Sequence, residues 1–152
     1  MKFAFCVFIL LLTGLKSFEQ TKQIDSLIRM LHNNEIKPDG NYFGPTYYLS
    51  NGPAVKLITI GKAVTVGLLN VLTDSSKGVV AHLILTELWK DSFPGVNPIH
   101  IDRDDITIFT VDGLTFFIKG DQVYANRHDL EMNLVRWKEF VRNDDILGEK
   151  RF

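Results

Sequence analysis

The sequence predicts an α+β fold, in which a helical hairpin and two flanking helices pack on a three-stranded antiparallel β-meander. In the first half of the chain, apolar residues recur at the three- and four-residue spacing of amphipathic helices. After residue 105 the spacing changes to two, on either side of Asp112-Gly113, a strong β-hairpin signal. With 152 residues, 45% of them hydrophobic, the chain has the size and apolar content of one globular domain.

The first 17 residues have the pattern of a secretory signal peptide. Lys2 precedes an apolar run, residues 3–12, that is shorter than the roughly 20 residues needed to span a bilayer. We expect cleavage near Ser17, with an uncleaved N-terminal anchor as the alternative. The predicted organisation is a signal peptide over residues 1–17, one α+β domain over residues 18–144 and a charged tail over residues 145–152.

Cleavage would remove Lys2, Lys16 and the single cysteine, Cys6, and would change the net charge from −1 to −3. A mature chain without cysteine has no disulfides and no thiolate chemistry. Its mildly acidic charge provides no basic footprint for nucleic acid. We therefore expect an exported protein of bacterial type, periplasmic or secreted, with no nucleic-acid partner and no stable membrane anchor after cleavage.

Amphipathic helices are expected near both ends of the mature chain, over residues 19–33 and 127–142. Their apolar stripes are Ile24, Leu27, Ile28 and Leu31 in the first helix, and Leu130, Leu134, Trp137 and Val141 in the second. Each stripe is wide enough to cover one side of a core, so both helices are expected to flank the rest of the fold.

A long loop is expected over residues 35–52, because prolines and glycines interrupt it throughout. The loop carries four aromatic residues: Tyr42, Phe43, Tyr47 and Tyr48. These side chains either fold back over a small hydrophobic cluster or form an exposed binding patch. Long loops inside compact domains are often functional, which keeps the second interpretation open.

Three short helices are expected over residues 53–61, 62–72 and 77–90, with a turn at residues 73–76. The pattern Leu57-x-x-Ile60-Gly61-Lys62-Ala63-Val64, followed by Leu68-Leu69-x-x-Leu72-x-Asp74, resembles the core of a HEAT-type helical repeat. The resemblance covers about residues 53–89 and implies a single HEAT-like hairpin, since no second copy of the pattern follows. HEAT proteins are binding scaffolds, and only that broad expectation carries over.

A linker over residues 91–105 is expected to precede strands over residues 106–111, 114–119 and 122–125. The Asp112-Gly113 turn pairs Val111 with Leu114 and Phe109 with Phe116, which gives the meander one almost wholly apolar core face. The other face is mixed and carries the stripe Ile108, Phe117 and Tyr124. We favour a cover for this stripe, with an exposed contact surface as the alternative.

No common catalytic or nucleotide-binding motif occurs in the sequence. The candidate catalytic or metal-ligating residues are His100, Asp102, Asp104 and His128. Imidazole and carboxylate groups bind divalent metals or exchange protons, provided that the fold brings them together. His82 lies on an apolar helix and is interpreted as a hydrogen-bonded core residue.

Two function classes remain. The favoured one is a non-enzymatic interaction or inhibitor-like module that binds another protein and needs no cofactor. Its candidate binding residues are Tyr42, Phe43, Tyr47, Tyr48, Phe117 and Tyr124. The alternative is a small metal-dependent or acid–base hydrolase built on His100, Asp102, Asp104 and His128. A structural accessory domain that binds nothing small is a third possibility.

Overall fold

The computed structural model describes residues 19–41, 44–92, 99–103 and 105–149, and the expected signal peptide lies outside these ranges. The fold is α+β. Its elements are a helix over residues 19–30, η1 (Asn33–Glu35), β1 (Ile36–Asn41), β2 (Gly44–Leu49), α2 (Pro53–Ile60), η2 (Lys62–Val64), α3 (Thr65–Leu69), α4 (Gly78–Trp89), β3 (Ile99–Arg103), β4 (Ile106–Val111), β5 (Leu114–Lys119), β6 (Gln122–Tyr124) and α5 (Arg127–Glu149).

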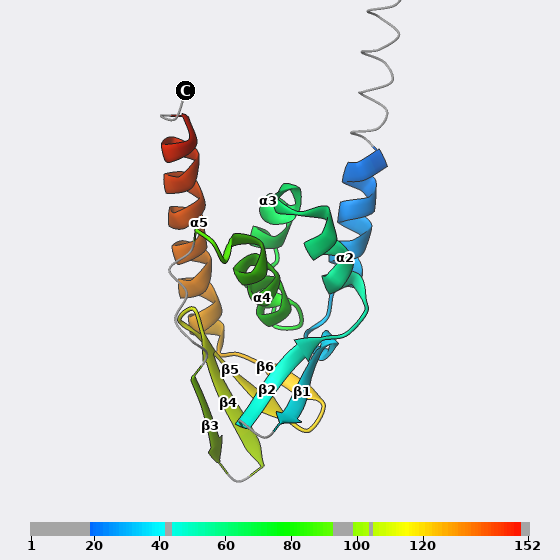
Figure 1. Cartoon of the computed structure of the whole chain (residues 1–152), viewed down its shortest axis with the longest axis vertical. Helices are drawn as coiled ribbons and strands as arrows, with labels where there is room; N and C mark the ends of the chain where they lie inside the picture. The colour runs from blue at the N-terminus through cyan, green and yellow to red at the C-terminus, as the bar shows by residue number, and fades with distance from the viewer. Residues whose placement is uncertain (1–18, 42–43, 93–98, 104, 150–152) are drawn as a thin grey trace, which may run out of the picture.

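Helix α4 is the centre of the molecule. Every residue from Gly78 to Leu85 is buried, as expected for a helix that is apolar on all sides. Helices α2 and α3 contact α4, while the helix of residues 19–30 and α5 stand on opposite sides of it, as Figure 1 shows. The strands lie together at the other end of the molecule. The α2–α4 region is the part that resembles a HEAT-like hairpin, and that resemblance stays a prediction.

The expected meander is present, with one strand more than predicted. The strands β3-β4-β5-β6 form a four-stranded antiparallel sheet. The predicted register is confirmed: Phe109 pairs with Phe116 and Val111 with Leu114 around a turn in which Asp112 (φ 45°) and Gly113 (φ 79°) both have positive φ. These φ values are those of a type I′ turn, which matches the twist of the flanking strands.

The prediction of a linker over residues 91–105 is wrong for its second half. Residues 99–103 form strand β3, which pairs with β4 from Ile99 opposite Thr110 to Arg103 opposite Ile106. Ile99 and Ile101 alternate with polar residues, a two-residue period that is only five residues long. A period this short beside aspartates does not distinguish a strand from a solvated turn.

The prediction of a long loop over residues 35–52 is also wrong. Strands β1 and β2 form a two-stranded antiparallel hairpin, with Ile36 opposite Leu49 and Pro38 opposite Tyr47. Proline lacks an N–H to donate, so it is tolerated in a two-stranded ribbon, where one edge of each strand needs no partner. The side chains of Ile36 and Leu49 pack in the core or against it.

Three helix boundaries differ from prediction. The first helix, expected over residues 19–33, ends at residue 30, and residues 33–35 form η1 instead. The helix expected over residues 62–72 is broken into η2 and α3, where the β-branched run Val64-Thr65-Val66 lowers helix propensity. Helix α5 continues past residue 142 to Glu149, into the residues expected to form a charged tail. Helix α2 ends as predicted, at Gly61 with φ 87°.

The side chain of Asn33 connects η1 to α4 and β6 through hydrogen bonds. This side chain is buried, donates from Nδ2 to the carbonyl oxygens of Ser75 (2.9 Å) and Val123 (3.4 Å), and accepts from the N–H of Val80 (3.1 Å). This one amide therefore caps the first turn of α4 and holds β6 beside η1. Glu35 acts similarly on α2, because its Oε2 accepts from the N–H of Ala54 (2.9 Å).

Candidate functional site

The face of the four-stranded sheet that points away from the core carries a row of large apolar side chains. Direct pairing places Ile101 beside Ile108, Ile108 beside Phe117 and Phe117 beside Tyr124, one residue from each strand. We call these four residues the outer row. Directly paired residues share a face, and burial alternates along β4 and β5, so the outer row points opposite to buried Phe109.

Solvent reaches the outer row. Ile101 is 57% exposed and Tyr124 38% exposed, while Ile108 and Phe117 are half-buried. The rings of Phe117 and Tyr124 stack with centroids 5.3 Å apart and planes 20° apart. A hollow of about 310 Å³ runs beside this stack. Its lining consists of Arg103, Asp105, Ile106, Ile108, Phe117, Tyr124 and Asn126. We expected the stripe Ile108, Phe117 and Tyr124 to be covered by another element. Within the part of the chain that the structure describes, it is instead accessible to solvent.

Charged groups border the hollow at one end. Lys119 Nζ lies 2.8 Å from Asp105 Oδ2, and both side chains are largely exposed. The hydrogen bond between them lowers the pKa of Asp105 and raises the pKa of Lys119, so both groups are charged at neutral pH. An exposed pair of this kind contributes little stability. Arg103, which also lines the hollow, is a further cation beside the outer row.

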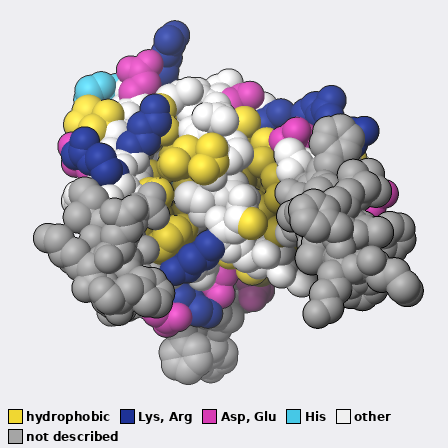
Figure 2. All heavy atoms as spheres, turned by 90° about the horizontal axis from the view of Figure 1, so that it is seen from above, with side chains coloured by type: hydrophobic (Ala, Val, Ile, Leu, Met, Phe, Trp, Pro, Cys, Tyr) yellow, Lys and Arg dark blue, Asp and Glu magenta, His cyan; other side chains and the backbone are white. Residues whose placement is uncertain are grey.

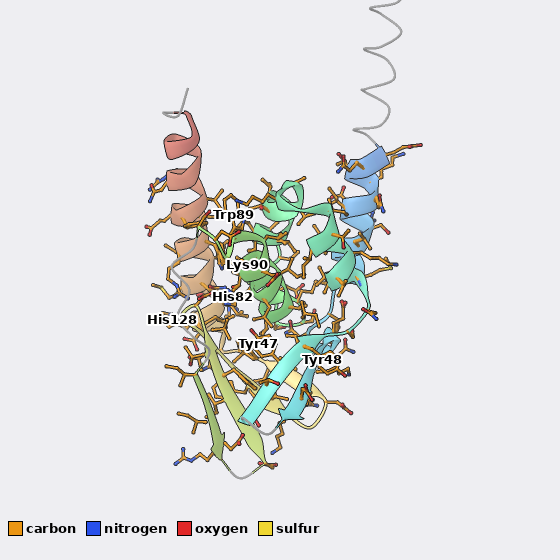
Figure 3. All side chains as sticks on the ribbon, in the orientation of Figure 1. Tyr47, Tyr48, His82, Trp89, Lys90 and His128 are labelled. Atoms are coloured by element: carbon orange, nitrogen blue, oxygen red, sulfur yellow. The ribbon has the colours of Figure 1, made fainter. Side chains whose placement is uncertain are left out.

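The four aromatic residues expected in one patch divide between different environments. Tyr47 packs edge-on against Phe109 (5.5 Å between ring centroids) and Phe116 (5.9 Å), and burial raises its pKa to about 12. Tyr48, the next residue along β2, is 53% exposed. Figure 3 shows the two rings on opposite sides of the hairpin. Tyr42 and Phe43 lie outside the described residues.

Only half of the proposed histidine–aspartate set can be placed. Asp102 is exposed and its Oδ1 accepts from the hydroxyl of Thr107 (2.9 Å), while His128 is exposed near the start of α5. Asp104 and the side chain of His100 lie outside what the structure describes. Among the described side chains, no three His, Cys, Asp or Glu residues lie close enough together to hold a metal ion.

His82 is a core residue with both ring nitrogens engaged. It is fully buried, its Nε2 lies 2.9 Å from the carbonyl oxygen of Val111, and its Nδ1 accepts from Trp137 Nε1–H at 3.0 Å. These partners are satisfied together by the neutral tautomer protonated on Nε2. Burial, together with the nearby guanidinium of Arg136, lowers the pKa of His82 to about 4. The ring therefore serves packing and carries no accessible chemistry.

Sequence reasoning missed two residues of the exposed sheet face, Ile99 and Ile101, because it placed them in a linker. Ile99 is 56% exposed on the same side of β3 as Ile101. The Ile-x-Ile alternation was the available signal. The helical end of the molecule is different: Figure 2 shows its apolar side chains interleaved with charged groups of both signs. The most exposed apolar side chain of α3 is Val66, at 69%.

Within the described part of the chain, no helix combines the length and the apolar character required to cross a bilayer. Comparison with known protein families, with curated proteins and with solved structures finds no match to this chain. The candidate site therefore rests on its own geometry: an apolar row across four strands, a shallow hollow beside two stacked rings, and charges at the border.

Proposed function

We propose that this chain is an exported, non-enzymatic interaction domain that binds another protein through the outer row. The observation that carries the proposal is the row itself, in which one large apolar side chain from each of four strands meets solvent. Contiguous apolar surface of this kind marks sites of protein association. Export is inferred from residues 1–17, and the HEAT-like resemblance favours the same class of function.

The chemistry around the row favours a protein over a small molecule. Aromatic residues and arginine dominate binding energy at protein interfaces, and Phe117, Tyr124 and Arg103 line one hollow. The hollow, at about 310 Å³, lies at the small end of the range for ligand sites and opens on a sheet face. Burying the stacked pair would remove apolar area from water, while Asp105 and Lys119 would lie at the polar rim.

The test is affinity capture from the native envelope and secreted fractions, with single substitutions compared at equal concentration of folded protein. Tyr124→Ser removes a partly exposed ring from an edge strand, and we expect the captured partner to bind at least tenfold more weakly. Tyr48→Ser is the matched control, since it removes a similarly exposed tyrosine from β2. Circular dichroism verifies that both variants fold.

A partner retained by Tyr124→Ser and lost by Tyr48→Ser would move the site to the β1–β2 hairpin and contradict the proposal. Equal capture by all three proteins would contradict it as well. Failure to capture any protein would favour the structural accessory domain.

A further inference from the structure

The imidazole of His82 connects α4, on which it lies, to two other elements. Its Nε2–H donates to the carbonyl oxygen of Val111 at the end of β4 (2.9 Å), and its Nδ1 accepts from the indole N–H of Trp137 on α5 (3.0 Å). The ring is fully buried. A second proton can therefore enter the ring only at Nδ1, where it breaks the hydrogen bond to Trp137.

The charge beside His82 also opposes protonation of the ring. The guanidinium of Arg136, on α5, lowers the pKa of His82 through its positive charge. Its Nη1 donates to the carbonyl oxygen of Asp112 (3.1 Å), the residue after Val111, so the guanidinium is held at the end of β4. Arg136 and Asp112 are the charged residues that α5 and the β4–β5 turn place near the ring.

Helix α5 is attached to the rest of the fold through its side chains. Leu130 and Trp137 are buried, and their packing keeps the helix docked on α4 and β5 at neutral pH. Figure 1 shows α5 on the side of α4 that faces away from α2. The hydrogen bonds of Asn33 and Glu35 join η1 to α4, β6 and α2, and their partners lie outside α5. These connections therefore do not depend on α5.

We propose that His82 is an acid-sensitive latch, and that protonation of its ring releases α5 from α4 and the sheet while the other described elements stay folded. The added proton sets two N–H groups against each other between His82 and Trp137, and it places a second positive charge beside Arg136. Both effects act between α4 and α5. The hydrogen bond from Nε2–H to Val111 is compatible with a charged ring, so protonation does not weaken the contact between α4 and β4.

The direction and size of the response follow from linkage. In the released form the ring meets solvent and its pKa returns to the ordinary value of 6.5, against about 4 in the docked form. The released form binds the proton first, so acid favours release below pH 6.5. With these two pKa values, the ratio of released to docked molecules rises about 60-fold between pH 7 and pH 4.5.

Hydrogen exchange of the full chain, followed by mass spectrometry between pH 7 and pH 4.5, tests the latch. Rates are corrected for the intrinsic exchange rate at each pH, and the amides of residues 131–139 in α5 are compared with those of residues 80–87 in α4. We expect protection in α5 to fall about 60-fold and to be at least tenfold weaker than protection in α4 at every pH. Equal protection in the two helices would mean that α5 leaves only when the whole molecule unfolds, which would overturn the proposal.

Two variants test whether the imidazole is the group that responds. His82→Gln keeps a donor and an acceptor but does not titrate, so the change in α5 protection should fall below about fivefold. His128→Gln is the matched control, since it makes the same replacement at an exposed histidine of α5 and should preserve the full change. A full change in His82→Gln would assign the release to another group and overturn the proposal.

The test does not depend on the stability of His82→Gln, because the comparison of α5 with α4 needs only the unmodified chain. A change below about fivefold in α5 of that chain would overturn the latch by itself. The latch involves α4, α5 and the end of β4, whereas the proposed function uses the outer row. Either proposal can therefore fail while the other holds.

Discussion

The indole N–H of Trp137 donates a hydrogen bond to Nδ1 of His82 across 3.0 Å in the fully buried interior. The other ring nitrogen of His82 contacts the carbonyl oxygen of Val111 at 2.9 Å. Three elements, α4, β4 and α5, therefore meet at one imidazole (Figure 3). Protonation of Nδ1 would set an N–H against the N–H of Trp137, so the contact requires a neutral ring.

We expect the free energy of unfolding to fall as the pH falls from about 6.5 toward 4. The pKa of His82 is lowered to about 4 by burial, against 6.5 in an unfolded chain, so the unfolded state binds the proton first. Stability from this group is fully present above pH 6.5 and is lost progressively down to pH 4. The full loss is about 3 kcal/mol, measured by urea unfolding at several pH values.

The control for this prediction is His82→Gln, whose amide can accept from Trp137 and donate to Val111 without titrating. This variant should be less stable at pH 7.5 but should show a smaller decline toward pH 4.5. Parallel curves for the two proteins would contradict the assignment of the decline to His82.

Asn33 offers a second prediction, because its side chain makes three hydrogen bonds in the interior. Asn33→Ala should lower the free energy of unfolding by about 3 kcal/mol, since it leaves buried backbone groups unpaired. Asn33→Asp should be at least as damaging at pH 7, because a carboxylate would face the carbonyl oxygens of Ser75 and Val123. Asn34→Ala, at the exposed next residue, should change stability by less than about 1 kcal/mol in the same urea assay.

Gly113 and Gly120 form a matched pair, since both have positive φ, at 79° and 56°. A Cβ at Gly120 would meet no described atom within 4 Å, whereas a Cβ at Gly113 would overlap the guanidinium of Arg136. Gly120→Ala should therefore lower the free energy of unfolding by about 1 kcal/mol through backbone strain. Gly113→Ala should lower it by about 1 kcal/mol more, because the flexible guanidinium of Arg136 must move away and give up its hydrogen bond to Asp112.

An Arg136→Ala background tests the cause of that difference. Arg136 Nη1 donates to the carbonyl oxygen of Asp112 at 3.1 Å, so the substitution itself is destabilising. Within this background, however, Gly113→Ala and Gly120→Ala should lower the free energy of unfolding by nearly the same amount, measured by thermal unfolding. A difference that persists would locate the strain at Gly113 in the turn itself.

The elements that sequence predicted well are those with a local signal. Asp112-Gly113 determines the turn type, and the turn determines which residues of β4 and β5 share a face, so the register followed. Gly61 ended α2, where its φ of 87° suits a residue without a Cβ. Such signals need only a few neighbouring residues, which is why they can be predicted without tertiary contacts.

The elements that sequence missed depend on partners far along the chain. Strand β3 is short, and its pairing with β4 supplies the hydrogen bonds that a five-residue segment cannot make alone. In β2, Tyr47 and Tyr48 look alike in sequence, yet Tyr47 packs on Phe109 while Tyr48 meets solvent. Only the docking of the hairpin on the sheet distinguishes these two tyrosines.

The candidate site was accordingly predictable in part. Phe117 and Tyr124 were identified from the meander register, and the structure stacks them on the open face. Ile101 extends their row, but its place depends on β3, which sequence assigned to a linker. Whether a sheet face is covered is decided by the packing of all other elements, and no local pattern of residues records it.

Site-specific photocross-linking tests the central claim most directly. A photoreactive phenylalanine analogue replaces Tyr124 in one protein and Tyr48 in another, and each is irradiated in the native exported fraction. We predict a discrete adduct with a second kind of protein from position 124 and none from position 48, identified by mass spectrometry. Adducts from position 48 alone, or no adduct from position 124, would contradict a binding site on the outer row.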